Sequence, residues 1–298
     1  MADTTTAVIL NPRAAGGATL KMLPRIHGIL KRIGEPYAIH VTQERGDATT
    51  AAKDFAGKGA TRVLAVGGDG TINEVANGLF QARTTAALGV IPVGHGNDFA
   101  RTIGVGKSVE QAVLRACERD SAPIDLGLAK WDTGEERAFI NVAGLGFDAL
   151  VAARTQHSKL PGSNLPYLTS ALTTLIGFNN IDVHVVADGE VVDTPGVFVS
   201  VANAQYMGGG YYFAPMASLD DGLLDLCIVG DFGKFELVRA IPSVYKGKHV
   251  THPKFTHIAA KEIRVESKQP ASVQLDGEVL GQAPVTFSVQ PGAIYLVK

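Results

Sequence analysis

Three glycines and an aspartate follow a short apolar run in the first third of the chain. Residues 63–66 predict a buried strand, and the glycine-rich stretch 67–70 ends it before an amphipathic helix begins. A strand, a glycine turn and a helix N-terminus together offer backbone N–H groups to a phosphate. A carboxylate in such a loop repels the anion, so we expect Asp69 to face Mg²⁺ or a metal-bound water. The alternative is a plain Gly-Asp-Gly turn with Thr71 as the helix N-cap.

Polar residues also follow the other three apolar runs of this region. They are Asn11 after residues 7–10, Thr42 after residues 37–41, and the segment 92–101 after residues 87–91. The carboxyl ends of parallel strands meet at one edge of a sheet, where ligands bind. Four strand ends that converge on one crevice favour a ligand site more strongly than any single motif does.

Three carboxylates are expected among these strand ends. Asp69, Asp98 and Asp125 each come at or near the end of an apolar run. Oxygen ligands of this kind suit Mg²⁺, which neutralises phosphate charge during phosphoryl transfer. Arg101 could complement a phosphate. The alternatives are helix caps for Asp98 and Asp125, and an ion pair with one of these acids for Arg101.

Two kinds of hydrophobic pattern organise the chain around these residues. Up to about residue 127, apolar strands alternate with helical periodicity, which predicts a parallel α/β sheet. Beyond it the apolar segments are short, alternating and separated by turns, as in an antiparallel sandwich, with helices at 147–156, 167–176 and 234–244. We predict an α/β nucleotide-binding domain over residues 1–128 and a β-rich sandwich over residues 129–298. The sequence leaves open whether the last strand returns to the first domain.

Composition and hydrophobic patterning argue against a nucleic-acid-binding, secreted or membrane-spanning protein. The 298 residues carry a net charge of −2 without a basic run, so we expect no nucleic-acid partner. The first six residues lack the features of a signal peptide, and no apolar run approaches the roughly 18 residues that span a bilayer. We therefore expect a cytoplasmic protein that contacts the inner membrane face only peripherally. Cys117 and Cys227 lie in apolar surroundings and are expected to be buried thiols.

Four segments in order along the chain resemble one family. The segments are Gly67-Gly68-Asp69-Gly70-Thr71-Ile72-Asn73-Glu74, residues 92–101, Asp220-Asp221-Gly222-Leu223-Leu224-Asp225 and Leu275-Asp276-Gly277-Glu278. With these segments the chain is similar to bacterial soluble lipid kinases of the diacylglycerol kinase catalytic-domain family, which includes sphingosine and ceramide kinases. NAD kinases share the first segment, whereas the second and fourth are typical of the lipid kinases.

This resemblance implies two domains with ATP in the cleft, Mg²⁺ as cofactor and a lipid as acceptor. The first loop departs from the family's usual Asn-Pro-x-Ser-Gly, and His95 stands where such kinases usually have Thr. Arg13, the backbone of the first loop, or His95 itself could replace the lost hydroxyl donors. The residues implied to hold ATP are Asn11, Pro12, Arg13, Ala14, Ala15, Thr42, Gly67, Gly68, Asp69, Gly70, Thr71, Ile72, Asn73, His95, Asn97 and Asp98.

The resemblance also implies the catalytic base. Glu278 would take the proton from a lipid hydroxyl as that oxygen attacks the γ-phosphorus, with Asp276 orienting it or assisting the metal network, and Asp69 completing the catalytic set. From the local sequence alone, Asp276-Gly277 is the commonest hairpin turn signal.

A second acidic loop resembles the family's structural Mg²⁺ site. Asp221, the carbonyl groups of Ser218 and Leu223, and Asp125 would be its ligands. An ordinary acidic turn is the alternative.

Two further features have competing explanations. His249, His252 and His257 have no nearby Cys and Pro253 interrupts any helix there, so we interpret them as surface histidines rather than a zinc site. The segment 203–213, rich in Tyr and Gly, could line an access route for an acyl chain, or could be an aromatic bend of the β-rich domain.

We therefore predict an ATP-dependent lipid kinase that phosphorylates a hydroxyl of diacylglycerol or a related lipid. The sequence leaves open whether it forms a homodimer. Two alternatives remain. One is an NAD kinase, which shares the glycine-rich motif. The other is a non-catalytic nucleotide or lipid sensor, suggested by Ala14, Ala15 and His95.

Overall fold

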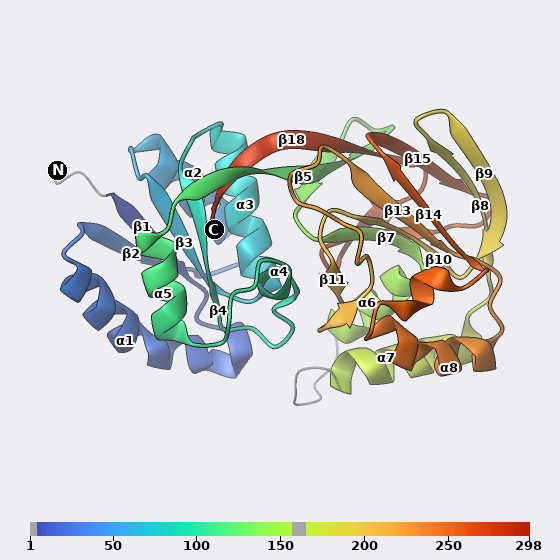
Figure 1. Cartoon of the computed structure of the whole chain (residues 1–298), viewed down its shortest axis with the longest axis horizontal. Coiled ribbons are helices and arrows are strands. Elements are labelled where there is room, and N and C mark those ends of the chain that lie inside the picture. Colours follow the sequence, from blue (N-terminus) through green and yellow to red (C-terminus); the bar gives the residue numbers. More distant parts are fainter. Residues whose placement is uncertain (1–4, 157–164) are drawn as a thin grey trace. The chain divides into compact units, whose positions relative to one another are not determined.

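The structure is a computed structural model that describes residues 5–156 and 165–298 (Figure 1). It contains two compact units. Unit 1 comprises Met1–Ile124 together with Gly292–Lys298, and unit 2 comprises Asp125–Pro291. The last residues of the chain therefore belong to unit 1.

Unit 1 is built on a parallel sheet. Its strands are β1 (Thr6–Leu10), β2 (Tyr37–Val41), β3 (Arg62–Gly67) and β4 (Ala87–Pro92), in the order β2-β1-β3-β4. The end of β18 (Val285–Val297) adds a further parallel strand, with Tyr295 opposite Ala87 and Leu296 opposite Leu88. The four N-terminal strands are almost entirely apolar because helices cover both faces of the sheet.

Helices surround this sheet in two pairs. α1 (Ala18–Ile33) and α5 (Val109–Glu118) share one apolar core with alternate residues of β1, β3 and β4. α2 (Asp47–Gly57) and α3 (Asp69–Ala82) pack on each other, and a Cβ at Gly78 would lie only 2.4 Å from the carbonyl oxygen of Thr49. The short helix α4 (Asp98–Thr102) follows β4. α3 begins at Asp69 with Gly68 as its N-cap, so the alternative of Thr71 as N-cap is wrong.

Unit 2 is an antiparallel β sandwich, as the alternating segments predicted. One sheet contains the first part of β18 and five other strands, and the opposite sheet has the order β14-β13-β10-β7-β16-β17. Side chains of both sheets meet in one apolar core, with Val185, Ile263 and Phe287 from the first and Leu145 and Leu226 from the second. The strands of the first sheet are β5 (Ser121–Trp131), β6 (Glu136–Phe139), β8 (Ile181–Ala187), β9 (Glu190–Gly196) and β15 (Glu262–Ser267). Those of the second are β7 (Val142–Gly146), β10 (Phe198–Ala202), β13 (Leu224–Val229), β14 (Phe255–Ala260), β16 (Ser272–Leu275) and β17 (Glu278–Gln282).

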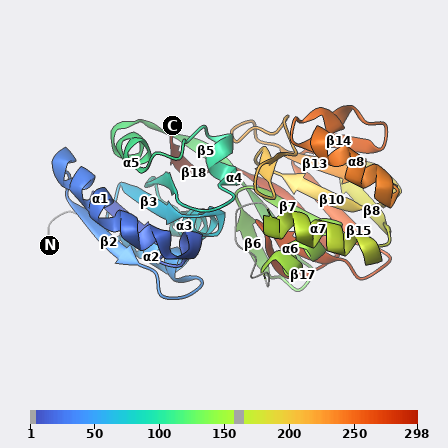
Figure 2. The same ribbon diagram turned by 90° about the horizontal axis from the view of Figure 1, so that it is seen from below.

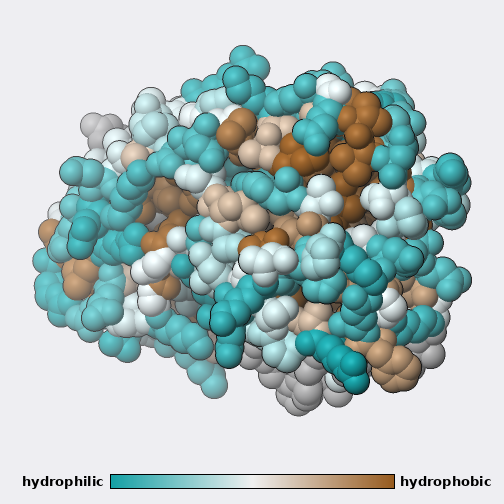
Figure 3. All heavy atoms as spheres, turned by 45° about the vertical axis from the view of Figure 1, so that its right-hand side comes forward, coloured by the Kyte–Doolittle hydropathy of each residue, from teal (hydrophilic) through white to brown (hydrophobic). Residues whose placement is uncertain are grey.

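Three helices and a small hairpin belong to unit 2 as well. α6 (Phe147–Gln156) and α7 (Leu165–Gly177) lie side by side (Figure 2), and α8 (Lys234–Val244) follows β13. The hairpin pairs β11 (Tyr206–Met207) with β12 (Tyr211–Tyr212). Hydrophilic side chains cover much of the face drawn in Figure 3, with hydrophobic patches between them. Within residues 5–156 and 165–298, no helix combines the length and the apolar character needed to cross a bilayer.

Candidate functional site

Two glycine-bearing loops of unit 1 lie against each other where strands β3 and β4 end. A Cβ at Gly94 would lie 2.5 Å from the Cα of Gly68, and a Cβ at Gly67 would lie 2.4 Å from the Oγ1 of Thr71. The N–H of Val93 donates to the carbonyl oxygen of Gly67 at 2.8 Å. A side chain at Gly94 would force the two loops apart, and one at Gly67 would collide with the Thr71 side chain of its own loop. Glycine is therefore needed at both positions for close approach.

Asp69 joins these loops through its carboxylate. Its Oδ1 accepts a hydrogen bond from the N–H of Phe99 at 3.0 Å, near the N-terminus of α4. Burial raises the pKa of Asp69, and hydrogen bonds from the backbone of residues 97–99 oppose that rise. Asp69 therefore ties the beginning of α3 to the beginning of α4.

A polar pocket of about 400 Å³ opens at the same edge of the unit 1 sheet. Asn11 helps to shape it, because its Nδ2 donates to the Oγ1 of Thr71 at 3.1 Å and its Oδ1 accepts the N–H of Arg13 at 2.9 Å. The pocket brings together the predicted residues Asn11, Arg13, Ala14, Ala15, Thr42, Gly68, Gly70, Thr71 and His95. It is also lined by Gln43, Glu44, Arg45, Ala48, Glu74 and Gly94. Gln43, Glu44 and Arg45 directly follow Thr42, so their position after a strand end could have identified them as pocket residues from the sequence.

The other residues predicted to hold ATP support the pocket without lining it. Asn97 adopts a positive φ of 52° and bonds through both side-chain atoms to the backbone of Gly94, at 2.9 Å each, which closes the turn before α4. Ile72 is fully buried and the Oδ1 of Asn73 accepts the side-chain amide of Asn77. The residues outside the pocket lining are Pro12, Gly67, Asp69, Ile72, Asn73, Asn97 and Asp98.

In unit 2, the predicted Asp276-Gly277 hairpin turn joins β16 to β17. Both turn residues have positive φ, 48° and 84°, as a two-residue hairpin requires. The carboxylate of Asp276 accepts the backbone N–H groups of Ile140 at 2.8 Å and of Asn141 and Val142 at 2.9 Å. Asp276 thus fixes the turn against the start of β7, and the half-buried Glu278 begins β17 immediately after it.

A glutamine connects this turn to a buried carboxylate. The Oε1 of Gln274 accepts the N–H of Gly277 at 2.7 Å, and its Nε2 donates to the Oδ2 of Asp148 at 3.0 Å. Both Gln274 and Asp148 are 3% exposed. Gln274 therefore holds the turn before Glu278 and the first turn of α6 in a fixed relation.

The predicted metal loop brings Asp125 close to residues 218–223. The Oδ2 of Asp125 accepts the N–H of Gly222 at 2.7 Å, and the Oδ1 of Asp221 accepts the N–H of Leu223 at 3.0 Å. Burial raises the pKa of Asp221, and repulsion from Asp225 and Asp125 raises it further. Within residues 5–156 and 165–298, no group of three or more His, Cys, Asp or Glu side chains is arranged to hold a metal ion.

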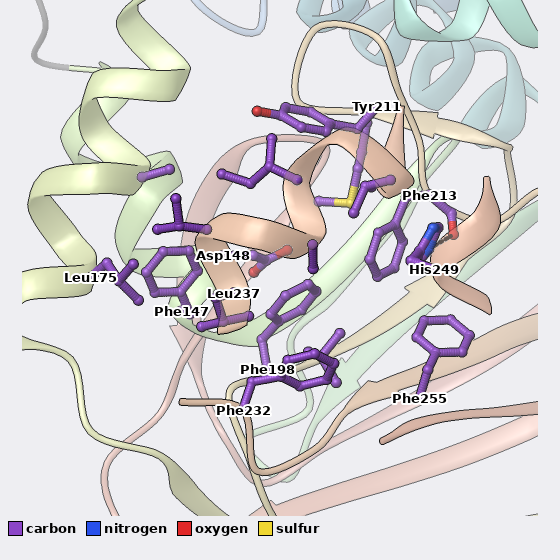
Figure 4. A pocket seen from close by; sticks show the side chains of 17 residues that line it. Phe147, Asp148, Leu175, Phe198, Tyr211, Phe213, Phe232, Leu237, His249 and Phe255 are labelled. Atoms are coloured by element: carbon purple, nitrogen blue, oxygen red, sulfur yellow. Dashed lines mark hydrogen bonds between the residues drawn. The ribbon is translucent and has the colours of Figure 1, made fainter. Parts of the chain in front are cut away.

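An apolar cavity of about 140 Å³ lies in unit 2 between the second sheet and its helices (Figure 4). Aromatic side chains dominate its wall. Met207, Tyr211 and Phe213 come from the segment predicted to line an acyl route, whereas α8 contributes residues that sequence reasoning did not single out. The rest of the aromatic wall consists of Phe147, Phe198, Phe232 and Phe255.

Asp148 is the acidic residue of this wall. Its Oδ1 is buried and has no hydrogen-bond partner among the residues that the structure describes. Burial raises the pKa of Asp148 to about 7, although the bond from Gln274 favours the charged form. A Cβ at Gly144 would lie 2.3 Å from the Asp148 Oδ2, so only glycine fits beneath the carboxylate.

His249 corrects the prediction of surface histidines. It is 7% exposed, its ring stacks on Phe213 with centroids 5.2 Å apart, and its Nε2 lies 2.8 Å from the carbonyl oxygen of Phe213. The residue contributes to the cavity wall because the chain after α8 folds back over β14. His257 instead pairs with the buried Asp225 at 2.6 Å.

The chain combines a parallel α/β unit that has a glycine-rich strand-to-helix loop with an antiparallel sandwich, and family models match both parts. Residues 5–129 match the diacylglycerol kinase catalytic domain, and residues 141–298 match the YegS C-terminal NAD kinase beta sandwich-like domain. The chain belongs to the diacylglycerol kinase family and is a lipid kinase. Membership of a kinase family implies the use of ATP.

Similar proteins span nearly the whole chain. The diacylglycerol kinase of Bacillus subtilis (strain 168) is 30% identical over 94% of this chain and 91% of its own length. That of Mycobacterium tuberculosis (strain H37Rv) is 30% identical over 97% and 94%. A crystal structure of a diacylglycerol kinase from Bacillus anthracis (strain Sterne) has a TM-score of 0.76 at 25% identity, covering 100% of this chain and 97% of that one.

Proposed function

We propose that this lipid kinase transfers the γ-phosphate of ATP to a hydroxyl of diacylglycerol or a closely related lipid. The observation that carries the choice of acceptor is the aromatic cavity of unit 2. Apolar and aromatic walls suit an acyl chain. NAD has no acyl chain to place against such walls, so the alternative of an NAD kinase explains the glycine-rich loop but not this cavity.

The polar pocket of unit 1 is the proposed ATP site. The N-terminus of α3 lies at this pocket through Gly70 and Thr71, and backbone N–H groups there favour a phosphate. Ala14 and Ala15 supply no hydroxyl, but Arg13 beside them brings a positive charge to the same wall. Asp69 and Asn97 act behind the pocket by holding the loop between β4 and α4, Asp69 through the backbone N–H groups of residues 97–99 and Asn97 through the backbone of Gly94. This arrangement supports binding without the hydroxyl donors usual in the family.

Mg²⁺ fits the acidic loop of unit 2. Burial raises the pKa of Asp221, and repulsion from Asp225 and Asp125 raises it further. A cation there would relieve this repulsion. Asp125, Asp221 and the carbonyl oxygens of Ser218 and Leu223 would hold it. A divalent cation supplies charge neutralisation for phosphate in reactions of this class.

Glu278 is the proposed general base. Glu278 is the first residue of β17 and directly follows the turn that Asp276 fixes by accepting three backbone hydrogen bonds. A carboxylate on a fixed turn can accept the proton of the lipid hydroxyl as that oxygen attacks phosphorus. Because the Asp276 carboxylate accepts three backbone hydrogen bonds, we propose that this residue positions Glu278.

The test is label transfer from γ-³²P-ATP and Mg²⁺ to a panel of lipids in mixed micelles, with NAD as a parallel acceptor. We expect label on diacylglycerol, lost in Glu278→Gln and retained in Glu190→Gln, which changes an exposed glutamate of β9. Label on NAD alone would overturn the acceptor. Full activity of Glu278→Gln would overturn the role of this residue.

The same function requires contact with a membrane surface, because the acceptor resides in a bilayer. We propose that this contact is peripheral.

A further inference from the structure

Helix α8 separates two different environments in unit 2. Leu237, Ile241 and Val244 line the aromatic cavity on one side. Phe235 on the other side is 87% exposed, the highest value for a large hydrophobic side chain within the described residues. Pro242, seven residues after Phe235, is exposed as well and lies on the same helical stripe. Tyr245, the residue directly after α8, is 42% exposed at the edge of this stripe, and its ring stacks on Tyr211 of the cavity wall with centroids 4.3 Å apart.

Cations surround this stripe. Lys234 and Arg239 on α8, and Lys246 and Lys248 just after it, are all exposed. Segment 231–254 has five Lys and Arg residues and two acids, a net charge of +3, whereas the whole chain carries −2. One of these acids, Glu236, is neutralised by Lys254, whose Nζ lies 2.6 Å from its Oε2. Positive charge is thus gathered around the exposed stripe.

An aromatic and cationic helix face fits the surface of an anionic bilayer. Aromatic side chains enter the headgroup region while Lys and Arg pair with lipid phosphates. A second copy of this chain fits less well, because a symmetric dimer through this face would bring the same cations together. The charge therefore favours a lipid surface over self-association.

We propose that the outer face of α8, formed by Lys234, Phe235, Arg239 and Pro242, docks the protein onto anionic lipid bilayers together with Tyr245 and Lys246 directly after the helix. The proposal rests on the lipid acceptor of the proposed function. The helix that contacts the bilayer is also a wall of the cavity assigned to the acyl chain. Docking through α8 therefore brings the acyl site to the surface from which the lipid must leave.

Sedimentation with sucrose-loaded vesicles tests this surface directly. We expect the full chain to bind vesicles of equal parts phosphatidylcholine and phosphatidylglycerol, and to bind pure phosphatidylcholine far more weakly. Phe235→Ala should weaken binding about tenfold through lost apolar burial. Arg239→Glu should weaken it about fivefold or more, and only Arg239→Glu should lose its effect in high salt, because screening acts on charge.

Matched control variants elsewhere on the surface test whether the loss of vesicle binding is specific to α8. Val191→Ala shortens an apolar side chain that is 54% exposed on β9, and Lys21→Glu, on the exposed side of α1, makes the same change of charge as Arg239→Glu. Both should bind vesicles as the unaltered chain does. Equal losses in the controls and the α8 variants would overturn the proposal, as would failure of the unaltered chain to bind anionic vesicles. Circular dichroism verifies that each variant is folded.

Activity on two forms of acceptor separates this proposal from the proposed function. The α8 variants should phosphorylate a short-chain diacylglycerol in monomeric solution at the normal rate, and long-chain diacylglycerol in vesicles at a reduced rate. Phosphorylation of neither form by the unaltered chain would contradict the acceptor, while vesicle binding would still test α8. Equal loss with both acceptors would place Phe235 and Arg239 in catalysis and overturn the docking surface.

Discussion

The two pockets of this protein are built in opposite ways. The pocket of unit 1 is polar and is formed by short loops, each directly after a strand, with glycine backbone at its centre. The cavity of unit 2 is apolar and is formed by side chains from helices, strands and connecting segments spread over more than 100 residues. A site made of backbone and strand ends can be found from the sequence, whereas a site made of distant side chains cannot. Single substitutions should therefore damage the polar pocket by altering its backbone geometry, and the apolar cavity by altering its charge and side-chain packing.

The largest expected effect concerns the turn of unit 2 that carries Glu278. Glu278→Gln should lower kcat about 1,000-fold, because a positioned base contributes this much to proton transfer. The KM for ATP should stay unchanged, since the proposed nucleotide pocket lies in unit 1. Steady-state kinetics with purified variants measures both. A raised KM for ATP with normal kcat would contradict the assignment of ATP binding to unit 1 and of the general base to unit 2.

The buried acid of the apolar cavity predicts a pH dependence of stability. The pKa of Asp148 is raised to about 7 from an ordinary value of 3.8, so the folded chain holds this proton more tightly than the unfolded chain. Stability from this group is therefore present below pH 4 and is lost as pH rises towards 7, by up to about 4 kcal/mol.

Urea unfolding from pH 4 to pH 8 measures this loss. Relative to Asp148→Asn, the unaltered chain should become progressively less stable across that range. Parallel stability curves for the two proteins would mean that Asp148 is charged throughout and that the cavity tolerates a carboxylate.

The glycine contact in unit 1 predicts a loss of both stability and nucleotide binding. Gly94→Ala places a Cβ 2.5 Å from the Cα of Gly68, so the two loops must separate, at a cost of about 2 kcal/mol in unfolding free energy. Gly70→Ala is the matched control in the same pocket, because a Cβ at Gly70 meets nothing within 4 Å. Thermal unfolding with and without ATP compares them. Equal effects of the two changes would show that backbone approach does not limit this pocket.

The smallest expected effect concerns Gln274, which links the buried acid of the unit 2 cavity to the turn before Glu278. Gln274→Leu removes the link between Asp148 and the turn before Glu278, so we expect kcat to fall about tenfold with an unchanged KM for ATP. Gln274→Glu keeps an acceptor for the Gly277 N–H but places a second acid against Asp148, so it should retain more of kcat than Gln274→Leu at low pH, where the two acids share a proton. If both variants lose the same activity, the turn does not depend on this hydrogen bond.

Much of the fold was predictable because neighbouring residues decide it. The alternation of strands and helices in unit 1 and the short strands of unit 2 follow from local hydrophobic patterns, and α8 begins and ends where its periodicity indicated. The hairpin at Asp276-Gly277 follows from the backbone preferences of these two residues. The loops after β1, β2, β3 and β4 could be placed in one pocket because parallel strands end at the same edge.

Partners distant in the sequence were beyond such reasoning. Nothing local indicates that Asp276 binds the backbone of residues 140–142, that Gly94 meets Gly68, or that Asp148 lies in an apolar wall. His249 was expected at the surface and is buried against Phe213. The sequence by itself determined the elements and the polar loops, because propensity, periodicity and turn chemistry act over a few residues. Only the tertiary structure decided which carboxylates are buried, which glycines touch and which aromatic rings share a cavity, because those contacts depend on how whole strands and helices pack.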